Sequence, residues 1–334
     1  MLLSSQRRKT VSTVISLPEP GPAENFRIER QEVGAPGPGF LRVRHEAIGL
    51  NYVDIYQRSG LYPLPAYPTT LGMEAAGVIE AIGEGVADLK VGDRIAYVGA
   101  PSGSYATTRL LAAEQAIRLP DTVSSKRAAA SMLKGLTTYM LLKDVYPVGE
   151  DTVMFVQSAA GGLGSMLVRW GKHFGATVIG AVSSPEKAEV AKRLGADHVI
   201  VGRETDLAAE VHRLTDGKGV DVAYEGLAGP NFLRVLDCVR PFGMIVNIGQ
   251  ITGPLPDNLA KEVAAPRAVA FARPSVMFYI SDNARYRKAA DRVVHHLAAG
   301  IGSDPSAEYK LEDVVTAHQD LETGNTTGSA ILLP

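Results

Sequence analysis

The sequence contains one cysteine, Cys238, among 334 residues. A single thiol excludes a framework of disulfide bonds within the chain and a metal site built from several thiolates. A chain that needs no disulfides is typical of a reducing compartment, so we expect the cytoplasm. Cys238 lies in an apolar, helix-like pattern, which predicts buried packing rather than a reactive thiol.

Long apolar runs are also absent from the sequence. No stretch approaches the length of about 20 residues that a helix needs to cross a bilayer, so we expect no membrane partner. Residues 1–10 are polar and are not followed by the apolar core of a signal peptide. We expect these first residues to form a loose tail.

Neither sign of charge dominates. The 34 Lys and Arg residues nearly balance the 36 Asp and Glu residues, which gives a formal net charge of -2. The longest basic block is Arg7-Arg8-Lys9, so the chain has no charge field that gathers nucleic acid, and we expect no nucleic-acid partner.

The composition is that of an ordinary globular protein, 46% hydrophobic and 21% charged, and the length favours two domains. Between Val11 and Ile117, short β-like runs alternate with turns rich in Gly and Pro, which predicts an irregular β domain. The runs are residues 40–46, 77–82, 94–98 and 104–108.

From about residue 150, strand-like and helix-like segments alternate, which predicts an α/β domain with a doubly wound parallel sheet. The expected strands are residues 152–156, 177–182, 198–201, 220–224 and 244–248. The expected helices are residues 128–142, 162–174, 185–194, 207–215 and 231–239. Toward the C-terminus we expect helices at 283–299 and 311–322, a short strand around Tyr309 and a last strand at 329–333.

The first of these strands runs into a turn of small residues, 157–164, and a helix follows it. Ala159, Gly161 and Gly164 have the spacing of a dinucleotide-binding glycine turn. Free N–H groups at the start of the helix would then face a pyrophosphate, which makes Ala160, Gly161, Gly162 and Leu163 candidate binding residues. The alternative is an ordinary strand-to-helix turn.

Several spaced motifs occur in one order: residues 51–62 (NYVDIYQRSGLY), 72–77 (GMEAAG), 91–94 (VGDR), 133–137 (LKGLT), the glycine turn, and the ending 328–334. Together they resemble the zinc-independent quinone oxidoreductases of the medium-chain dehydrogenase/reductase superfamily, from about Val14 to Pro334. The resemblance implies a Rossmann cofactor-binding domain at residues 134–273. It also implies a GroES-like catalytic domain at residues 1–133 and 274–334, and a homodimer.

Zinc-dependent relatives place Cys where this chain has Asn51 and His where it has Met73. Because an amide is a poor zinc ligand and a thioether prefers softer metals, we expect no metal site. Glu74 remains as a single carboxylate, and the seven histidines lack a metal-binding spacing. Without a Lewis acid, the chemistry is expected to favour acceptors that need little polarisation.

An Asp or Glu about 20 residues past the glycine turn typically selects NADH, but this chain has Ser183 and Ser184 there. These hydroxyls, with Lys187 in the next helical turn and Arg203 after the third strand, suit the 2′-phosphate of NADPH. The alternative for Lys187 is a solvated helix residue. Gly202 and Gly324 stand where the family often has Tyr and a basic residue, so we expect a preference for NADPH that is weaker than usual.

The resemblance implies roles for residues around the nicotinamide. Tyr52 would donate a proton or hydrogen bond to the reduced acceptor, or else pack at the domain seam. Asn51 would orient the ribose or carboxamide, and Thr137 would lie near the nicotinamide. Further cofactor contacts are expected from Gly249 and Gln250 after the fifth strand, and from Arg273, for which a tie between the domains is the alternative.

Three further expectations concern packing and function. Asp54 and Arg58 are spaced i, i+4, which predicts a helix ion pair. Apolar residues 277–280 would line an acceptor pocket or pack in a core or dimer. The expected activity is that of an NADPH:quinone oxidoreductase; the alternatives are an NADPH-dependent reductase of enones or 2-alkenals, and a cofactor-binding protein without significant turnover.

Overall fold

In the computed structural model, one unit is built from both ends of the chain, Met1–Leu136 and Met277–Pro334, and a second from the middle, Thr137–Val276. The structure describes residues 10–99, 101–264 and 267–334, so the tail expected at residues 1–10 lies outside it except for Thr10. The observed limits fall three residues beyond the expected ones at 133 and 273.

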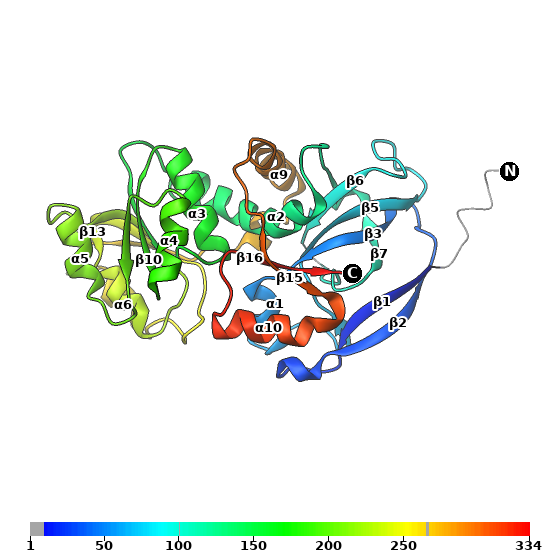
Figure 1. Ribbon diagram of the computed structural model, residues 1–334, viewed down its shortest axis with the longest axis horizontal. Helices are drawn as coiled ribbons and strands as arrows, with labels where there is room; N and C mark the ends of the chain where they lie inside the picture. The colour runs from blue at the N-terminus through cyan, green and yellow to red at the C-terminus, as the bar shows by residue number, and fades with distance from the viewer. Residues whose placement is uncertain (1–9, 100, 265–266) are drawn as a thin grey trace. The chain divides into compact units, whose positions relative to one another are not determined.

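The first unit contains two sheets (Figure 1). A three-stranded sheet has the order β2-β1-β4, and a seven-stranded sheet has the order β15-β16-β3-β5-β6-β8, with β7 also paired to β3. The strands are β1 Thr10–Leu17, β2 Arg27–Val33, β3 Phe40–Gly49, β4 Thr69–Thr70, β5 Glu74–Ile82, β6 Arg94–Val98, β7 Thr108–Ala112, β8 Ile117–Arg118, β15 Pro305–Lys310 and β16 Ser329–Leu333.

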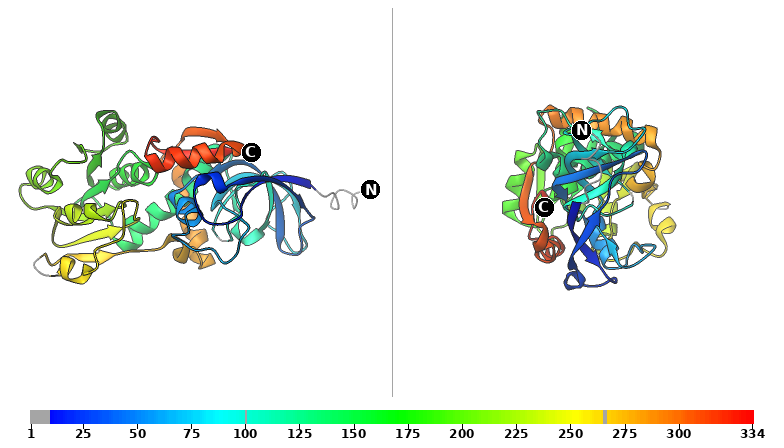
Figure 2. Two further views of the ribbon diagram at one scale, coloured as in Figure 1. Left: turned by 90° about the horizontal axis from the view of Figure 1, so that it is seen from below. Right: turned by 90° about the vertical axis from the view of Figure 1, so that its right-hand side faces the viewer.

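Both ends of the chain share the core of this unit. Strand β16 pairs antiparallel with β3, and Leu332 and Val314 pack in one cluster with Ile15, Leu41 and other N-terminal side chains. In Figure 2 the orange and red C-terminal elements lie beside the blue N-terminal ones. The helices of this unit are α1 Tyr52–Arg58, α9 Asn283–Ala298 and α10 Val314–Thr323; α2 Ser125–Tyr139 and α8 Val276–Tyr279 lie across its limits.

The second unit is a six-stranded parallel sheet with the order β11-β10-β9-β12-β13-β14. This is the doubly wound order 3-2-1-4-5-6, which confirms the predicted fold class. The strands are β9 Val153–Gln157, β10 Thr177–Val182, β11 His198–Val201, β12 Val220–Glu225, β13 Val239–Asn247 and β14 Ala270–Ala272. The helices are α3 Gly162–His173, α4 Pro185–Arg193, α5 Leu207–Leu214, α6 Pro230–Leu236 and α7 Leu259–Ala264.

Alternation along the strands explains how helices cover this sheet. Phe155 packs in the cluster that includes Val211 of α5 and Phe232 of α6, whereas its neighbour Met154 lies against α3. Successive side chains of a strand point to opposite faces, so a strand covered on both sides is apolar throughout. The run of residues 153–156 has that pattern.

Two element predictions were wrong. The strand expected at 104–108 is found at β7, because Ala106 forms only an isolated bridge with Val14 and the Tyr105 N–H donates to Leu71 O. The helix expected at 231–239 ends at Leu236, where the Cys238 N–H closes a turn on Val235 O and Val239 begins β13. Helix α2 starts at Ser125, and a π-helical segment, Met140–Val145, follows it.

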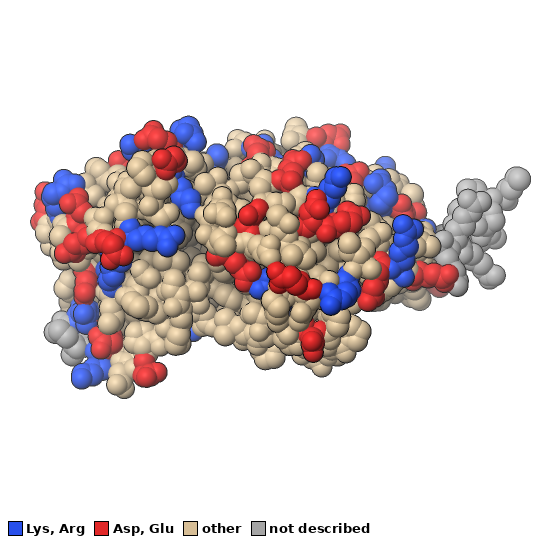
Figure 3. Space-filling model, turned by 60° about the horizontal axis from the view of Figure 1, so that its bottom comes forward, with Lys and Arg blue, Asp and Glu red and all other residues tan. Residues whose placement is uncertain are grey.

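Charged side chains of both signs are interspersed on the face drawn in Figure 3. This distribution agrees with the near balance of acidic and basic residues in the sequence. None of the helices in the described ranges is long and apolar enough to cross a bilayer.

Candidate functional site

The predicted cofactor-binding residues of the second unit gather at the carboxyl ends of its strands. Because all the strand pairs are parallel, these ends lie at one edge of the sheet, where ligands bind in doubly wound folds. The turn to α3 follows β9, Ser183 and Ser184 follow β10, Arg203 follows β11, Gly249 and Gln250 follow β13, and Arg273 follows β14.

The glycine turn leaves the start of α3 without a side-chain cap. Gly161 is the N-cap residue, and Ser165 N–H is the first to bond back to its carbonyl oxygen. A Cβ on Gly164 would overlap the carbonyl oxygen of Ser158, so the turn requires glycine at this close approach. First-turn N–H groups and the helix dipole suit an anionic oxygen, which fits the pyrophosphate of a dinucleotide. Ala160 lies in the same turn, and Gly162 and Leu163 belong to the first turn of α3.

Ser184 is the N-cap of α4, and its Oγ accepts the Lys187 N–H at 3.4 Å. Lys187 is half-buried in the first helical turn, and Arg203 is exposed after β11. This local arrangement follows from the sequence, since Ser before Pro185 is a strong helix-start signal. The two cations and the helix N-terminus are compatible with a phosphate group, whereas the exposed Glu186 carboxylate in the same turn, which accepts a hydrogen bond from Ser184, opposes it.

Arg234 of α6, which is not among the predicted site residues, holds the loop that carries Arg203. Its guanidinium donates to the carbonyl oxygens of Arg203 and Thr205, each at 2.7 Å. The Gly202 N–H also donates to Val182 O of β10, so the Arg234 bonds add to the contacts that hold this loop against the sheet. Only a long-range contact reveals this role, since α6 begins well beyond the loop in sequence.

Near the end of β13, Arg273 donates to the side-chain oxygen of Gln250 at 2.6 Å. Two predicted contact residues are therefore linked within one unit. Gly249 is also held, because its carbonyl oxygen accepts from Asn247 Nδ2 at 2.8 Å.

Glu225 is a further residue at this edge that is not among the predictions. Its Oε1 accepts the N–H groups of Leu227 and Ala228 at 2.7 and 2.6 Å, and its Oε2 accepts from Asn247. Burial raises the pKa of the Glu225 carboxyl, and these donors oppose the rise. In the sequence, Glu225 can be recognised as an acidic residue at the end of an apolar strand.

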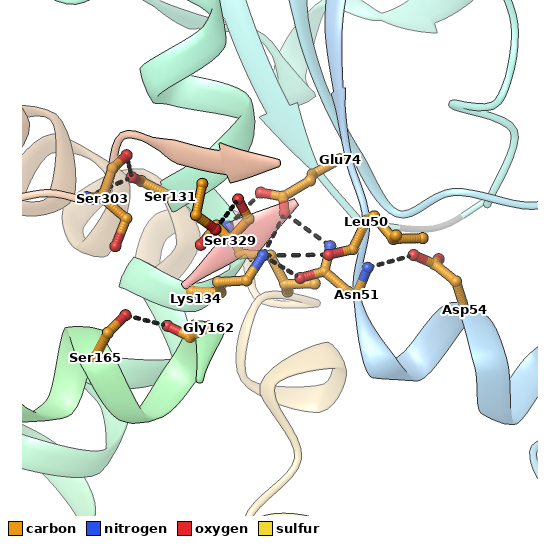
Figure 4. A network of polar contacts seen from close by, with 12 residues as sticks. Leu50, Asn51, Asp54, Glu74, Ser131, Lys134, Gly162, Ser165, Ser303 and Ser329 are labelled. Carbon is orange, nitrogen blue, oxygen red and sulfur yellow. Dashed lines mark hydrogen bonds and ion pairs between the residues drawn. The ribbon is translucent and has the colours of Figure 1, made fainter. Parts of the chain in front are cut away.

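In the first unit, Asn51 belongs to a buried polar cluster with Glu74 and Lys134 (Figure 4). Asn51 Nδ2 donates to Glu74 Oε1 at 2.7 Å, and Lys134 Nζ donates to Asn51 Oδ1 at 2.7 Å. Lys134 Nζ lies 3.7 Å from Glu74 Oε1 and 3.4 Å from the Leu50 carbonyl oxygen. Lys134 is not among the predicted site residues. In the sequence, it can be recognised as a single lysine within an apolar helical pattern.

Burial and mutual attraction act in opposite directions in this cluster. Burial raises the pKa of Glu74 and lowers that of Lys134, while the attraction between the two charges opposes both shifts. Asp54 is fully buried in the first turn of α1, where Asp54 Oδ2 accepts the Asn51 N–H at 2.9 Å. Burial raises the pKa of Asp54 to about 7.

Tyr52 begins α1 directly after Asn51, and its ring lies 5.7 Å from that of Tyr56. The side chain is half-buried, and desolvation raises its pKa to about 12. The phenol therefore keeps its proton at neutral pH, as a hydrogen-bond donor must. Thr137 lies in α2 as the first residue of the second unit.

The predicted ion pair between Asp54 and Arg58 was wrong. Arg58 Nη1 and Nη2 donate to the two carboxylate oxygens of Glu322 in α10, at 2.9 and 2.6 Å. Asp54 instead caps its own helix through Asn51. The i, i+4 spacing brings the two side chains to one helix face, but the bidentate partner from α10 offers the better geometry for a guanidinium.

The two positions where zinc-dependent relatives bind metal have other partners here. Asn51 Oδ1 accepts from Lys134, and Met73 Sδ accepts from Gln57 Nε2 at 3.6 Å. Within the described ranges, no group of three or more His, Cys, Asp or Glu side chains is arranged to hold a metal ion.

Cys238 is buried, as predicted, and burial raises the pKa of its thiol to about 12.

Among the apolar residues 277–280, Phe278 is 78% exposed whereas Tyr279 is buried. These four residues therefore do not share one environment.

Two family models match the chain: the alcohol dehydrogenase GroES-like domain at residues 37–121 and the zinc-binding dehydrogenase family at residues 162–294. A quinone oxidoreductase of Pseudomonas aeruginosa is 40% identical over 301 residues, 90% of this chain and 92% of that protein. A 2-haloacrylate reductase of a Burkholderia species is 36% identical over 321 residues, 94% of this chain and 96% of that protein.

Solved structures give the same grouping. The Escherichia coli quinone oxidoreductase complexed with NADPH is 35% identical, with a TM-score of 0.93, and the match covers 96% of this chain and 100% of that one. The quinone oxidoreductase of Pseudomonas syringae pv. Tomato DC3000 is 41% identical, with a TM-score of 0.92 and coverage of 97% and 100%. The chain therefore belongs to the quinone oxidoreductases of the medium-chain dehydrogenase/reductase superfamily.

Proposed function

We propose that this protein is an NADPH:quinone oxidoreductase that transfers reducing equivalents from NADPH to a quinone. The observation that carries the proposal is the uncapped start of α3 at the carboxyl edge of a doubly wound sheet. Chain-long similarity to quinone oxidoreductases, one of them solved with NADPH, supports it.

NADPH supplies the hydride when it is bound. The N–H groups of Ala160, Gly161, Gly162 and Leu163 hold the pyrophosphate. Ser183, Ser184, Lys187 and Arg203 hold the 2′-phosphate, which a carboxylate in the same place would repel. NADPH is therefore preferred to NADH, and the preference is reduced by the glycines at 202 and 324.

Gly324 has a structural reason to be glycine. It ends α10 in the left-handed backbone conformation, with φ of 70°. Residues other than Gly and Asn rarely adopt this conformation. A basic side chain at this position would strain the helix end. This chain therefore lacks one phosphate-binding cation because the end of α10 requires glycine.

Asn51 and Tyr52 of the first unit act on the nicotinamide end of the cofactor and on the acceptor. Tyr52 donates a hydrogen bond or proton to the developing quinol oxygen, and Asn51 orients the ribose or carboxamide. Gly249, Gln250, Arg273 and Thr137 make the further contacts. The reaction is zinc-independent, because an amide and an occupied thioether are poor ligands at positions 51 and 73.

A reductase of activated enones or 2-alkenals is the second candidate. The 36% identity to a 2-haloacrylate reductase favours it, since a 2-haloacrylate is an activated alkene. Both activities use the same hydride donor and differ in the shape of the acceptor pocket.

The deciding experiment follows NADPH absorbance with a panel of 1,2-quinones, 1,4-quinones and 2-alkenals, with and without a chelator. Faster turnover of quinones that a chelator leaves unchanged is the expected result. Faster turnover of alkenals would select the second candidate, and loss of activity with chelator would contradict zinc independence. Binding of NADPH without oxidation by any acceptor would indicate a cofactor-binding protein without turnover.

The protein is further proposed to be a cytoplasmic homodimer. Strand β14 is the last strand at one edge of the parallel sheet, which leaves that edge to pair with a second copy. Phe242, 85% exposed in β13, supports a contact on this side of the unit. Light scattering of the purified protein tests the dimer, and cell fractionation tests the location.

A further inference from the structure

Lys134 is a buried cation whose contacts fix the orientation of another side chain. It is only 8% exposed, and an ammonium group donates hydrogen bonds but accepts none. Its 2.7 Å contact must therefore be made to the amide oxygen of Asn51 rather than to the amide nitrogen. The ambiguity between O and N that affects amide side chains is removed by this partner.

Glu74 fixes the opposite end of the same amide. A carboxylate only accepts, so Glu74 Oε1 pairs with Asn51 Nδ2 at 2.7 Å. Glu74 Oε2 is held in turn by the Leu133 N–H at 2.6 Å, which belongs to the residue before Lys134. The cation and the anion thus clamp the amide between them, and both are anchored through the same part of α2 (Figure 4).

The clamp leaves Asn51 with one unused group. An amide nitrogen carries two hydrogens, and one of them is donated to Glu74. For the second, the part of the chain that the structure describes provides no hydrogen-bond acceptor. Because Asn51 is only 7% exposed, an unmade hydrogen bond here is costly, and a ligand oxygen would relieve that cost.

We propose that Lys134 is a positioning residue of the reductase: by holding Asn51 Oδ1, it keeps the remaining Asn51 Nδ2–H directed to an uncharged acceptor oxygen of the bound nicotinamide cofactor. The proposal rests on the proposed function. It goes beyond that function because Lys134 acts through Asn51 and needs no contact of its own with cofactor or quinone.

The test compares two substitutions that remove the same charge. Lys134→Met and Lys134→Gln both leave Glu74 without its cation, so they share the loss of stability that comes from the unpaired carboxylate. Only Gln still donates a hydrogen bond to Asn51 Oδ1. The measurements are NADPH binding by direct titration, kcat and KM for one quinone, and thermal unfolding.

We expect Lys134→Met to bind NADPH about tenfold more weakly than Lys134→Gln, the effect of one hydrogen bond. The difference should vanish when Asn51→Ala is added to both, because the two residues act as a unit. Equal binding by the two variants, or a difference that persists with Asn51→Ala, would overturn the proposal.

If either variant fails to fold, the comparison is repeated with Glu74→Gln in both chains, which removes the stranded buried charge. The wild-type protein separates the two hypotheses. Wild-type protein that neither binds NADPH nor reduces quinones overturns the proposed function and this proposal with it. Normal wild-type activity, with no difference between the Lys134 variants, overturns this proposal alone.

Discussion

Glu225 and Asn247, at the ends of neighbouring strands β12 and β13, are joined by a 2.7 Å hydrogen bond from Asn247 Nδ2 to Glu225 Oε2. The same two side chains also hold the Leu227 and Ala228 N–H groups and the Gly249 carbonyl oxygen. One buried pair therefore shapes two of the loops at the ligand-binding edge.

Glu225→Gln should lower stability by about 1–3 kcal/mol, because an amide nitrogen would face a donor in place of one acceptor oxygen. NADPH affinity should fall with it, since both loops lose their anchor. Urea unfolding and NADPH titration measure the two effects. The exposed Glu204→Gln is the control, and an equal response from both variants would show that the buried pair has no special role.

The preference for NADPH over NADH should depend on Lys187 and Arg203, and on Arg234, which holds the loop that carries Arg203. Lys187→Ala and Arg203→Ala should each raise the KM for NADPH about tenfold and leave NADH kinetics nearly unchanged, the loss expected for one charge-assisted hydrogen bond. Arg234→Ala should raise the KM for NADPH in the same direction as the Arg203 variant, because the carbonyl groups of Arg203 and Thr205 lose their guanidinium partner. Lys192→Ala, in the same helix as Lys187, is the matched control; a change in NADH kinetics of equal size would refute the phosphate-binding role.

Tyr52→Phe should lower quinone turnover by less than about tenfold, a smaller effect than is typical for removal of a general acid. A quinone gives a resonance-stabilised product, so a hydrogen bond suffices. Because burial raises the pKa of Tyr52 to about 12, the wild-type rate should show no loss from this group up to about pH 11. Tyr62→Phe, also in the first unit, is the control. A drop of several decades would make the phenol essential.

Buried histidines should make the protein sensitive to acid. Burial lowers the pKa of His45 to about 4 and that of His318 to about 3, so both are neutral when folded. The unfolded chain protonates them near 6.5, and the stabilisation present above that pH is lost as the pH falls, by about 1.4 kcal/mol per unit and per group. Asp54, whose pKa is raised, contributes in the opposite direction.

Comparing the pH dependence of stability in wild type and in His318→Gln isolates the contribution of His318. His318→Gln should be less stable than wild type at pH 7, since contacts with Arg58 and Tyr105 are lost, but its stability should fall less between pH 6.5 and 5. Denaturant unfolding at several pH values gives both quantities. The exposed His295→Gln should keep the wild-type slope. Parallel curves for wild type and His318→Gln would contradict the assignment.

Cys238 should resist thiol reagents in the native protein, because it is buried and burial raises its pKa to about 12. Reaction with a chromogenic disulfide should release one equivalent only after denaturation. Rapid labelling of the folded protein would show that the thiol is accessible.

Local pattern was enough to predict most of the second unit. Small residues between an apolar strand and a helix marked the turn at 157–164, and the helix expected at 185–194 begins at Pro185 as α4. Such signals are local because caps and turns are satisfied within a few residues. The strand ends then follow, and with them the edge at which the predicted residues gather.

Partners distant in sequence were beyond such patterns. Arg58 was assigned to Asp54 one turn away, but its partner Glu322 lies 264 positions along the chain. Lys134 contributed to the predictions only as part of the motif at residues 133–137, because its role depends on Asn51 and Glu74, which the start of α1 and β5 bring to it. Spacing predicts neighbours on one element, whereas only packing decides which elements meet.

The pairing of β16 with β3 bears on how the chain folds as it is synthesised. Ile331 and Leu332 pair with Gly49 and Ile48, so the seven-stranded sheet stays incomplete until residue 333 has left the ribosome. The parallel sheet is continuous in sequence and has all its strands once residue 276 has emerged. Because domains fold as units during translation, the middle of this protein is able to reach its native state before its beginning does.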